Sequence, residues 1–163
     1  MAAAKLTLDT NLIHEYLKQR RRVDVVRKLL CLANQGIVEL AVTAPIHEDV
    51  PCDPLASRLN ELPDLGITFT GTVARVGEWV LGRDMLGDDG FAAFPPLGNK
   101  LAQRRGKNPP DSRDWAHLHA HFLLKRDVFL TWDGGILCLA PELEEQFGVV
   151  VMKPEDYIQS LDS

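Results

Sequence analysis

The stretch that decides the fold is KLTLDTNLIHEYL, residues 5–17. Its first part, Lys5 to Leu8, is a short run typical of a β-strand, and the apolar residues in 12–17 recur at helical spacing. Asp9 stands between them, at the point where a strand would end and a helix would begin. A strand that passes directly into a helix favours the alternating order of an α/β fold.

The rest of the chain continues this alternation. Further strands are expected at residues 37–42, 67–70, 128–131 and 149–152, and helical patterns continue through 25–32 towards Gly36, cover 73–81 and 112–126, include a turn within 55–62, and resume at Pro154. The pattern predicts a three-layer α/β/α fold around a parallel sheet of about five strands with right-handed crossovers. We expect one domain over residues 1–163, with a long irregular connection at about 82–110 of the kind that is usually functional or mobile.

The composition is that of a soluble globular protein. The chain has 163 residues, of which 45% are apolar and 25% charged, so a disordered tail or a fibrous repeat is excluded as its main content. No apolar run approaches the roughly 18 residues of a membrane helix, and Met1 to Leu8 lacks the apolar core of a signal peptide. Cys31, Cys52 and Cys138 show no paired spacing, which favours free thiols. We therefore expect a cytoplasmic protein with no membrane partner.

The charge is unevenly distributed. The net charge of −5 argues against binding of nucleic acid through overall positive charge. Two basic runs nevertheless stand out, namely Lys18, Arg20, Arg21, Arg22, Arg27 and Lys28 around the single acid Asp24, and Lys100, Arg104, Arg105 and Lys107 with no acid between them. Each run is either an ordinary solvated face or a local anion contact. If the 82–110 connection folds over an acidic pocket, the second run can hold the backbone of an RNA substrate.

Four acids are expected at one end of the sheet. Asp9 and Asp133 directly follow strands, Glu48 lies just beyond the strand at 37–42, and Asp114 lies in the first turn of the helix from Ser112. Carboxylates gathered this way repel one another unless a divalent cation joins them, and oxygen ligands suit Mg²⁺ or Mn²⁺ better than zinc. The alternative is that Asp9 and Asp114 cap helices and Glu48 lies on the surface. Spacing alone leaves both interpretations open.

Several segments, taken in order, resemble the signature blocks of the PIN-domain nucleases. They are LTLDTNLI (6–13), VTAPIHE (42–48), DWAHLHA (114–120) and FLTWD (129–133), and VMKPEDY (151–157) is similar to the family's usual end. The resemblance implies metal-dependent endonucleolytic cleavage of RNA, by toxins that are commonly paired with an antitoxin and that commonly form homodimers. It also implies that the catalytic and metal-binding residues, holding one or two Mg²⁺ or Mn²⁺ ions, are Asp9, Glu48, Asp114 and Asp133.

Other positions bear on the same site. Asn11 is similar to the family's polar residue beside the first acid and Thr131 to the hydroxyl before the last, and we interpret each as orienting a carboxylate. Asp111 competes with Asp114 for the third acid, and Asp49 is a lesser rival of Glu48. The chain departs from the family in its longer connection and in the histidines around Asp114.

Histidines and tryptophans near the acids have two interpretations each. His117, His119 and His121 lie on the helix from Ser112, where such residues are more often core or surface than metal ligands. His117 is also a candidate to contact a substrate phosphate or to shuttle a proton. Trp115 and Trp132 flank the acids and are either packing residues or platforms on which RNA bases stack.

Two further functions compete with the nuclease. Asp9 can be the nucleophile of a phosphatase, but the dehalogenase-like pattern requires a second aspartate where Asn11 stands. A non-catalytic module that keeps the fold and binds RNA or protein is the other alternative. It predicts an incomplete set of acids, whereas all four are present in the sequence.

Overall fold

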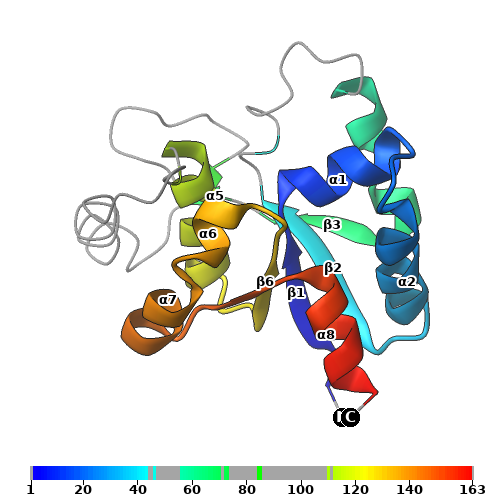
Figure 1. The fold of residues 1–163 in the computed structure, drawn as a ribbon. Helices are drawn as coiled ribbons and strands as arrows, with labels where there is room; N and C mark the ends of the chain where they lie inside the picture. Colours follow the sequence, from blue (N-terminus) through cyan, green and yellow to red (C-terminus); the bar gives the residue numbers. More distant parts are fainter. Residues whose placement is uncertain are drawn as a thin grey trace.

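The computed structural model describes residues 2–43, 46, 56–70, 72–73, 84–85, 110 and 112–162. Five strands form one parallel sheet, as the sequence predicted (Figure 1). They are β1 (Ala4–Leu8), β2 (Val38–Thr43), β3 (Ile67–Thr70), β6 (Val128–Leu130) and β7 (Val150–Met152). A separate parallel ladder joins β4 (Thr72–Val73) to β5 (Asp84–Met85).

The strand order is β3-β2-β1-β6-β7. The chain therefore moves outward from β1 through β2 to β3 and later crosses to the other side of β1 to form β6 and β7. The direction of winding reverses between β1 and β6, whose ends are paired through Leu8 and Leu130. In open parallel sheets, ligands bind beyond the carboxyl ends of the strands at such a switch point.

Helices cover both faces of the sheet, which confirms the three-layer prediction (Figure 1). On one face lie α1 (Thr10–Leu17), α2 (Val23–Asn34), α8 (Pro154–Leu161) and the 3₁₀ turns η1 (Ala56–Glu61) and η2 (Pro63–Leu65). On the other lie α5 (Ser112–Leu123), α6 (Gly134–Leu137) and α7 (Ala140–Phe147). In the described residues no helix has the length and apolar character needed to cross a membrane.

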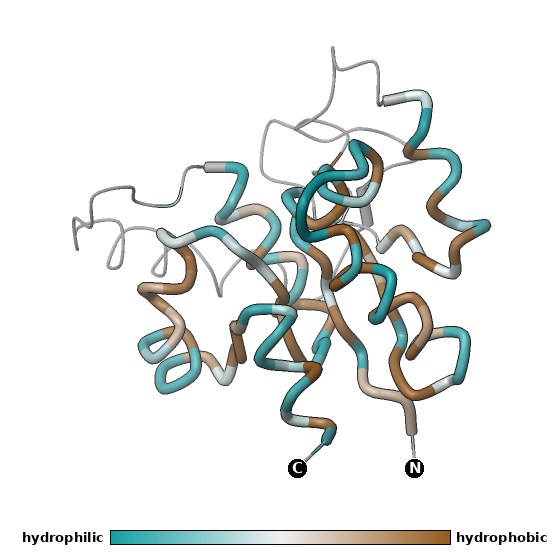
Figure 2. Tube along the Cα trace, turned by 45° about the vertical axis from the view of Figure 1, so that its right-hand side comes forward, coloured by the Kyte–Doolittle hydropathy of each residue, from teal (hydrophilic) through white to brown (hydrophobic). Residues whose placement is uncertain are grey.

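The side chains of β1 alternate between the two faces. Leu6 and Leu8 are fully buried in the cluster beneath α1 and α2, whereas Thr7 points to α5 and bonds a histidine there. Figure 2 shows the apolar residues concentrated in the strands and on the inward sides of the helices. One side of β1 thus packs against the helices α1 and α2, and its other side carries polar residues towards the switch point.

Three details differ from the sequence predictions. The helical period expected to continue from 12–17 into 25–32 is interrupted, because Gln19 adopts a left-handed φ of 47° and the chain turns before α2. Helices α6 and α7 were not predicted. Residues 72–73 form a strand where a helix over 73–81 was expected to begin. The remainder of that expected helix, and nearly all of the connection at 82–110, lie outside the described residues.

Candidate functional site

Asp9 is held at the switch point by both neighbouring elements. Its backbone N–H donates to the Leu130 carbonyl at 3.0 Å, which extends the β1–β6 pairing by one residue. Its carboxylate caps α1, since Oδ1 accepts the Thr10 N–H at 2.7 Å. The residue is only 5% exposed. Asp9 therefore caps a helix, as the alternative interpretation of the sequence proposed, and its nearly buried carboxylate lies at the carboxyl end of the central strand.

The second carboxylate oxygen of Asp9 belongs to a compact polar network. Oδ2 accepts a hydrogen bond from the Thr131 hydroxyl and another from Asn11 Nδ2 at 2.7 Å. The Thr131 oxygen in turn accepts from Asn11 Nδ2 at 3.0 Å and from the Asp133 N–H at 2.9 Å. Thr131 thus uses its one donor on Asp9 and both acceptor positions on its neighbours. The hydrogen bonds from Asn11 and Thr131 hold the Asp9 carboxylate in one orientation.

Burial raises the pKa of Asp9 from 3.8 to about 6. The removal of the carboxylate from water is the main cause, and the negative charge of Asp114 on α5 adds to it. The Thr131 hydroxyl, the positive character of His117 and the Thr10 N–H act in the opposite direction but do not compensate. Asp9 and Asp114 therefore influence each other electrostatically, although 105 positions separate them in the numbering from 9 to 114. A cation beside them would relieve this repulsion.

The other predicted acids have different outcomes. Asp133 is half-buried and caps α6, where its Oδ1 accepts the Ile136 N–H at 2.9 Å. Its backbone is tied to Asp9 through the Thr131 hydroxyl. Glu48, Asp49 and Asp111 lie outside the described residues, as do Lys100, Arg104, Arg105 and Lys107. The structure thus links three of the four acids to one end of the sheet and leaves the choice between Asp111 and Asp114 open.

The fit of this site to a divalent cation is partial. Asp9 accepts three hydrogen bonds, whereas an ionised carboxylate offers about four acceptor positions, so room for one further ligand bond remains. Carboxylate and hydroxyl oxygens suit Mg²⁺ or Mn²⁺. Among the described residues, however, no three His, Cys, Asp or Glu side chains lie close enough together to hold a metal ion. A complete site needs a ligand from elsewhere, and Glu48 is the acid that the sequence offers.

His117 and His121 fasten α5 to the sheet. His117 is 2% exposed, and its two ring nitrogens contact the hydroxyls of Thr43 and of Thr10, the latter at 3.3 Å. His121 Nδ1 lies 2.8 Å from the Thr7 hydroxyl, and burial lowers the pKa of this histidine to about 4. These contacts favour the packing interpretation over a substrate-binding role for His117, because neither ring nitrogen of His117 faces open solvent.

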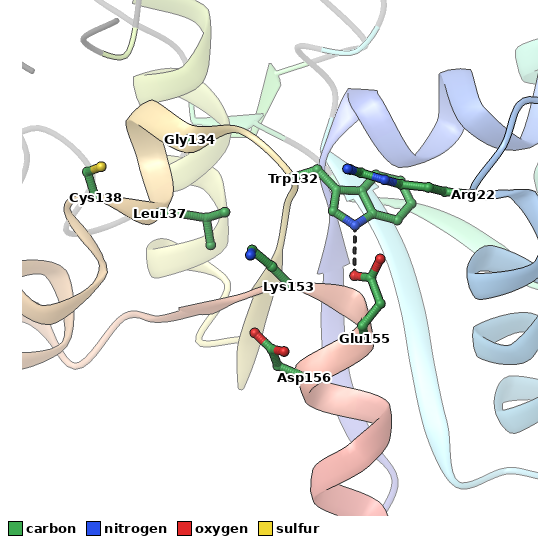
Figure 3. A pocket seen from close by; sticks show the side chains of 8 residues that line it. All are labelled: Arg22, Trp132, Gly134, Leu137, Cys138, Lys153, Glu155 and Asp156. Atoms are coloured by element: carbon green, nitrogen blue, oxygen red, sulfur yellow. Dashed lines mark hydrogen bonds between the residues drawn. The ribbon is translucent and has the colours of Figure 1, made fainter. Parts of the chain in front are cut away.

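An open hollow of about 660 Å³ lies beside this site (Figure 3). Its lining comes from three places, which are the α1–α2 turn, helix α6 with the residues on either side of it, and the start of α8. The lining residues are Arg22, Trp132, Gly134, Leu137, Cys138, Lys153, Glu155 and Asp156. The Arg22 guanidinium lies over the Trp132 ring, 5.0 Å from its centroid. The indole Nε1 donates to Glu155 at 2.8 Å.

Sequence reasoning identified only part of this hollow. In the sequence, Trp132 is a candidate stacking platform and Arg22 belongs to a basic run, but no pattern connects the two. Lys153 and Glu155 stand out in the sequence only as part of the segment VMKPEDY (151–157). No spacing rule joins these positions, because they come from three separate parts of the chain. No protein-family model and no curated protein matches this chain.

Proposed function

We propose that this protein is a divalent-metal-dependent endoribonuclease of the PIN type. The observation that carries the proposal is the buried Asp9 carboxylate at the switch point, whose pKa is raised to about 6 by burial and by Asp114. A protein gains nothing in stability from ionising such a group. A bound cation would offset the cost of burying the ionised Asp9 carboxylate near Asp114, which is why such an arrangement favours a functional site.

The residues have separate tasks in this proposal. Asp9, Asp114 and Asp133, with Glu48, would hold Mg²⁺ or Mn²⁺, which when bound neutralises charge on the scissile phosphate and helps water to attack it. Asn11 and Thr131 fix the direction of the Asp9 lone pairs, so that little reorganisation is needed on binding. Burial keeps bulk water away from the carboxylate and strengthens its interactions.

A cleavage assay tests the proposal. Wild-type protein is incubated with single-stranded RNA in Mn²⁺, in Mg²⁺ and in EDTA, beside Asp9→Asn and Asp114→Asn. We expect metal-dependent cleavage that both substitutions abolish. Asp24→Asn is the matched control, since Asp24 is an exposed acid on α2 that pairs with Arg27. Cleavage that persists in EDTA, or in Asp9→Asn, would contradict the proposal.

The toxin role is a finer part of the same proposal. It includes an antitoxin partner, a homodimer and action in the cytoplasm. Expression of the wild-type chain in bacteria should arrest growth, and expression of Asp9→Asn should not. Size-exclusion chromatography with light scattering measures the oligomer, and equal growth of both strains would remove the toxin role.

One observation favours a second candidate, a non-catalytic module that binds RNA or protein. In the part of the chain that the structure describes, no three potential ligands form a metal-binding group. This candidate predicts that RNA binds without being cut in Mn²⁺ or Mg²⁺. The same incubation therefore distinguishes the two candidates.

A further inference from the structure

The hollow beside Trp132 combines three features that single-stranded nucleic acid uses. Trp132 gives it a flat π-surface, Arg22 and Lys153 supply cations, and it adjoins the candidate catalytic network. Its volume of about 660 Å³ falls within the range of about 300–1,000 Å³ typical of small-ligand sites. One nucleotide is a ligand of suitable size.

The π-surface is fixed before any ligand arrives. Trp132 is held by its Nε1 bond to Glu155 and packs partly against the core cluster beneath α1. Arg22 is exposed, yet its guanidinium lies over the ring, and its backbone N–H donates to Glu15 at 3.1 Å. Bases of single-stranded RNA stack on aromatic rings and on guanidinium planes. Because both groups are already positioned, little side-chain entropy is lost when a base binds.

The opposite wall and the floor complete the arrangement. In Figure 3, Leu137 stands across the hollow from Trp132, with the Lys153 side chain between them. The exposed ammonium of Lys153 can contact a phosphate, and the exposed carboxylate of Asp156 can accept N–H groups of a base. Because Glu155 is already bonded to the indole, Asp156 is the carboxylate left to contact a base edge, and the cations of the hollow can contact the RNA backbone.

The position of Trp132 connects the hollow to the acids. It lies between Thr131, which bonds Asp9, and Asp133, which caps α6. Its own backbone N–H lies 3.5 Å from Asn11 Oδ1. The two chain neighbours of Trp132, Thr131 and Asp133, thus both belong to the Asp9 network. A nucleotide bound against Trp132 would lie beside that network. The α1–α2 turn that carries Arg22 also contains Arg20 and Arg21, both exposed.

We infer that this hollow is a subsite for one nucleotide of a single-stranded RNA, with the base against the Arg22–Trp132 pair and a phosphate on Lys153. The inference rests on the proposed function for its choice of RNA as the ligand. It adds to that function a place where the substrate is held, outside the set of acids.

RNA binding in EDTA tests the subsite independently of cleavage. The probe is a fluorescein-labelled single-stranded RNA about ten nucleotides long, which is within the usual site sizes of such proteins. Arg22→Lys keeps the charge but removes the plane, and we expect the dissociation constant to rise about five- to tenfold. Arg27→Lys is the matched control, because Arg27 is exposed, pairs with Asp24 and does not line the hollow. It should bind as the wild type does.

Two further measurements keep the test independent of folding defects. Lys153→Met should reduce the slope of log affinity against log salt by about one phosphate contact. Ultraviolet cross-linking of a thiouridine-substituted RNA to the wild-type protein should label the peptide that contains Trp132. Equal affinities for wild type and Arg22→Lys, or cross-links confined to other peptides, would overturn the subsite. A protein as the true occupant predicts that same absence of change in RNA affinity.

The outcomes separate the two proposals. Cleavage in Mn²⁺ with unchanged binding of Arg22→Lys would keep the nuclease and remove the subsite. Weakened binding of Arg22→Lys without any cleavage would keep the subsite as part of an RNA-binding module and remove the nuclease.

Discussion

Replacing Asp9 with asparagine is expected to stabilise the metal-free protein near neutral pH, although it should abolish cleavage. The folded protein raises the pKa of Asp9 from 3.8 to about 6. An acid whose pKa is higher in the folded state contributes stability below its unfolded pKa and loses it as pH rises through the folded pKa. The loss for Asp9 is therefore complete above about pH 6 and corresponds to about 3 kcal/mol.

Asparagine recovers most of this free energy. Its amide oxygen can accept from Asn11 and Thr131, as Oδ2 does in the wild type. Its NH₂ then faces the Thr10 N–H, and losing that cap costs about 1 kcal/mol. The net gain is about 2 kcal/mol, which corresponds to a rise of about 1 M in the urea midpoint for a protein of this size.

Urea unfolding followed by circular dichroism in EDTA measures the effect. The gain should be present at about pH 7.5 and mostly absent at about pH 4, where the folded wild type carries a protonated Asp9. Adding Mn²⁺ should stabilise the wild type and leave Asp9→Asn unchanged. Asp133→Asn is the control, since asparagine caps the half-buried start of α6 as well as aspartate does. An Asp9→Asn protein that is less stable at both pH values would refute the reasoning.

Three other predictions follow from buried contacts. Burial lowers the pKa of His121 to about 4, so the contribution of His121 to the free energy of unfolding should fall by up to about 3 kcal/mol as pH drops from 6.5 to 4, opposite in sign to the contribution of Asp9, and urea titrations of His121→Gln should lack the His121 contribution. Arg126→Ala should lower the free energy of unfolding by about 2–4 kcal/mol, because Arg126 is buried and donates to the Leu6 and Glu39 carbonyls. Glu39→Gln should lower it by less than about 1 kcal/mol, because the Glu39 carboxylate is 45% exposed. Equal losses in these two variants would contradict that account. Thr131→Val removes a hydrogen bond that lowers the pKa of Asp9, so the pKa of Asp9 should rise further above 6. Carbon NMR titration of the Asp9 carboxyl group measures this pKa, and an unchanged value would contradict the prediction.

Much of the fold could be predicted because it depends on short-range patterns. The strands are runs of apolar and β-branched residues, and Asp9 marks the change from strand to helix. Helix α7 was missed because only Leu143 is buried in APELEEQF, so the apolar period is weak. Its boundaries did carry a signal, since Pro141 lies in its first turn and Gly148 adopts the left-handed φ of 66° that ends it.

The break between α1 and α2 could not be predicted from local preference. No glycine or proline marks it, and Gln19 takes a left-handed conformation within a run of charged residues. The turn holds because backbone groups beyond it return to α1, with the Arg20 N–H bonded to the Glu15 carbonyl and the Arg22 N–H to the Glu15 side chain. That turn is also what carries Arg22 to Trp132.

The sequence by itself determined the alternation of strand and helix and the position of Asp9 at the end of the first strand, and it supplied the candidate acids. Strand order, the burial that raises the pKa of Asp9, and the meeting of Arg22, Trp132 and Lys153 were decided only by tertiary structure. The physical reason is the distance along the chain over which each effect acts. Periodicity and capping act within a few residues, whereas desolvation and charge coupling depend on which distant segments the sheet places side by side.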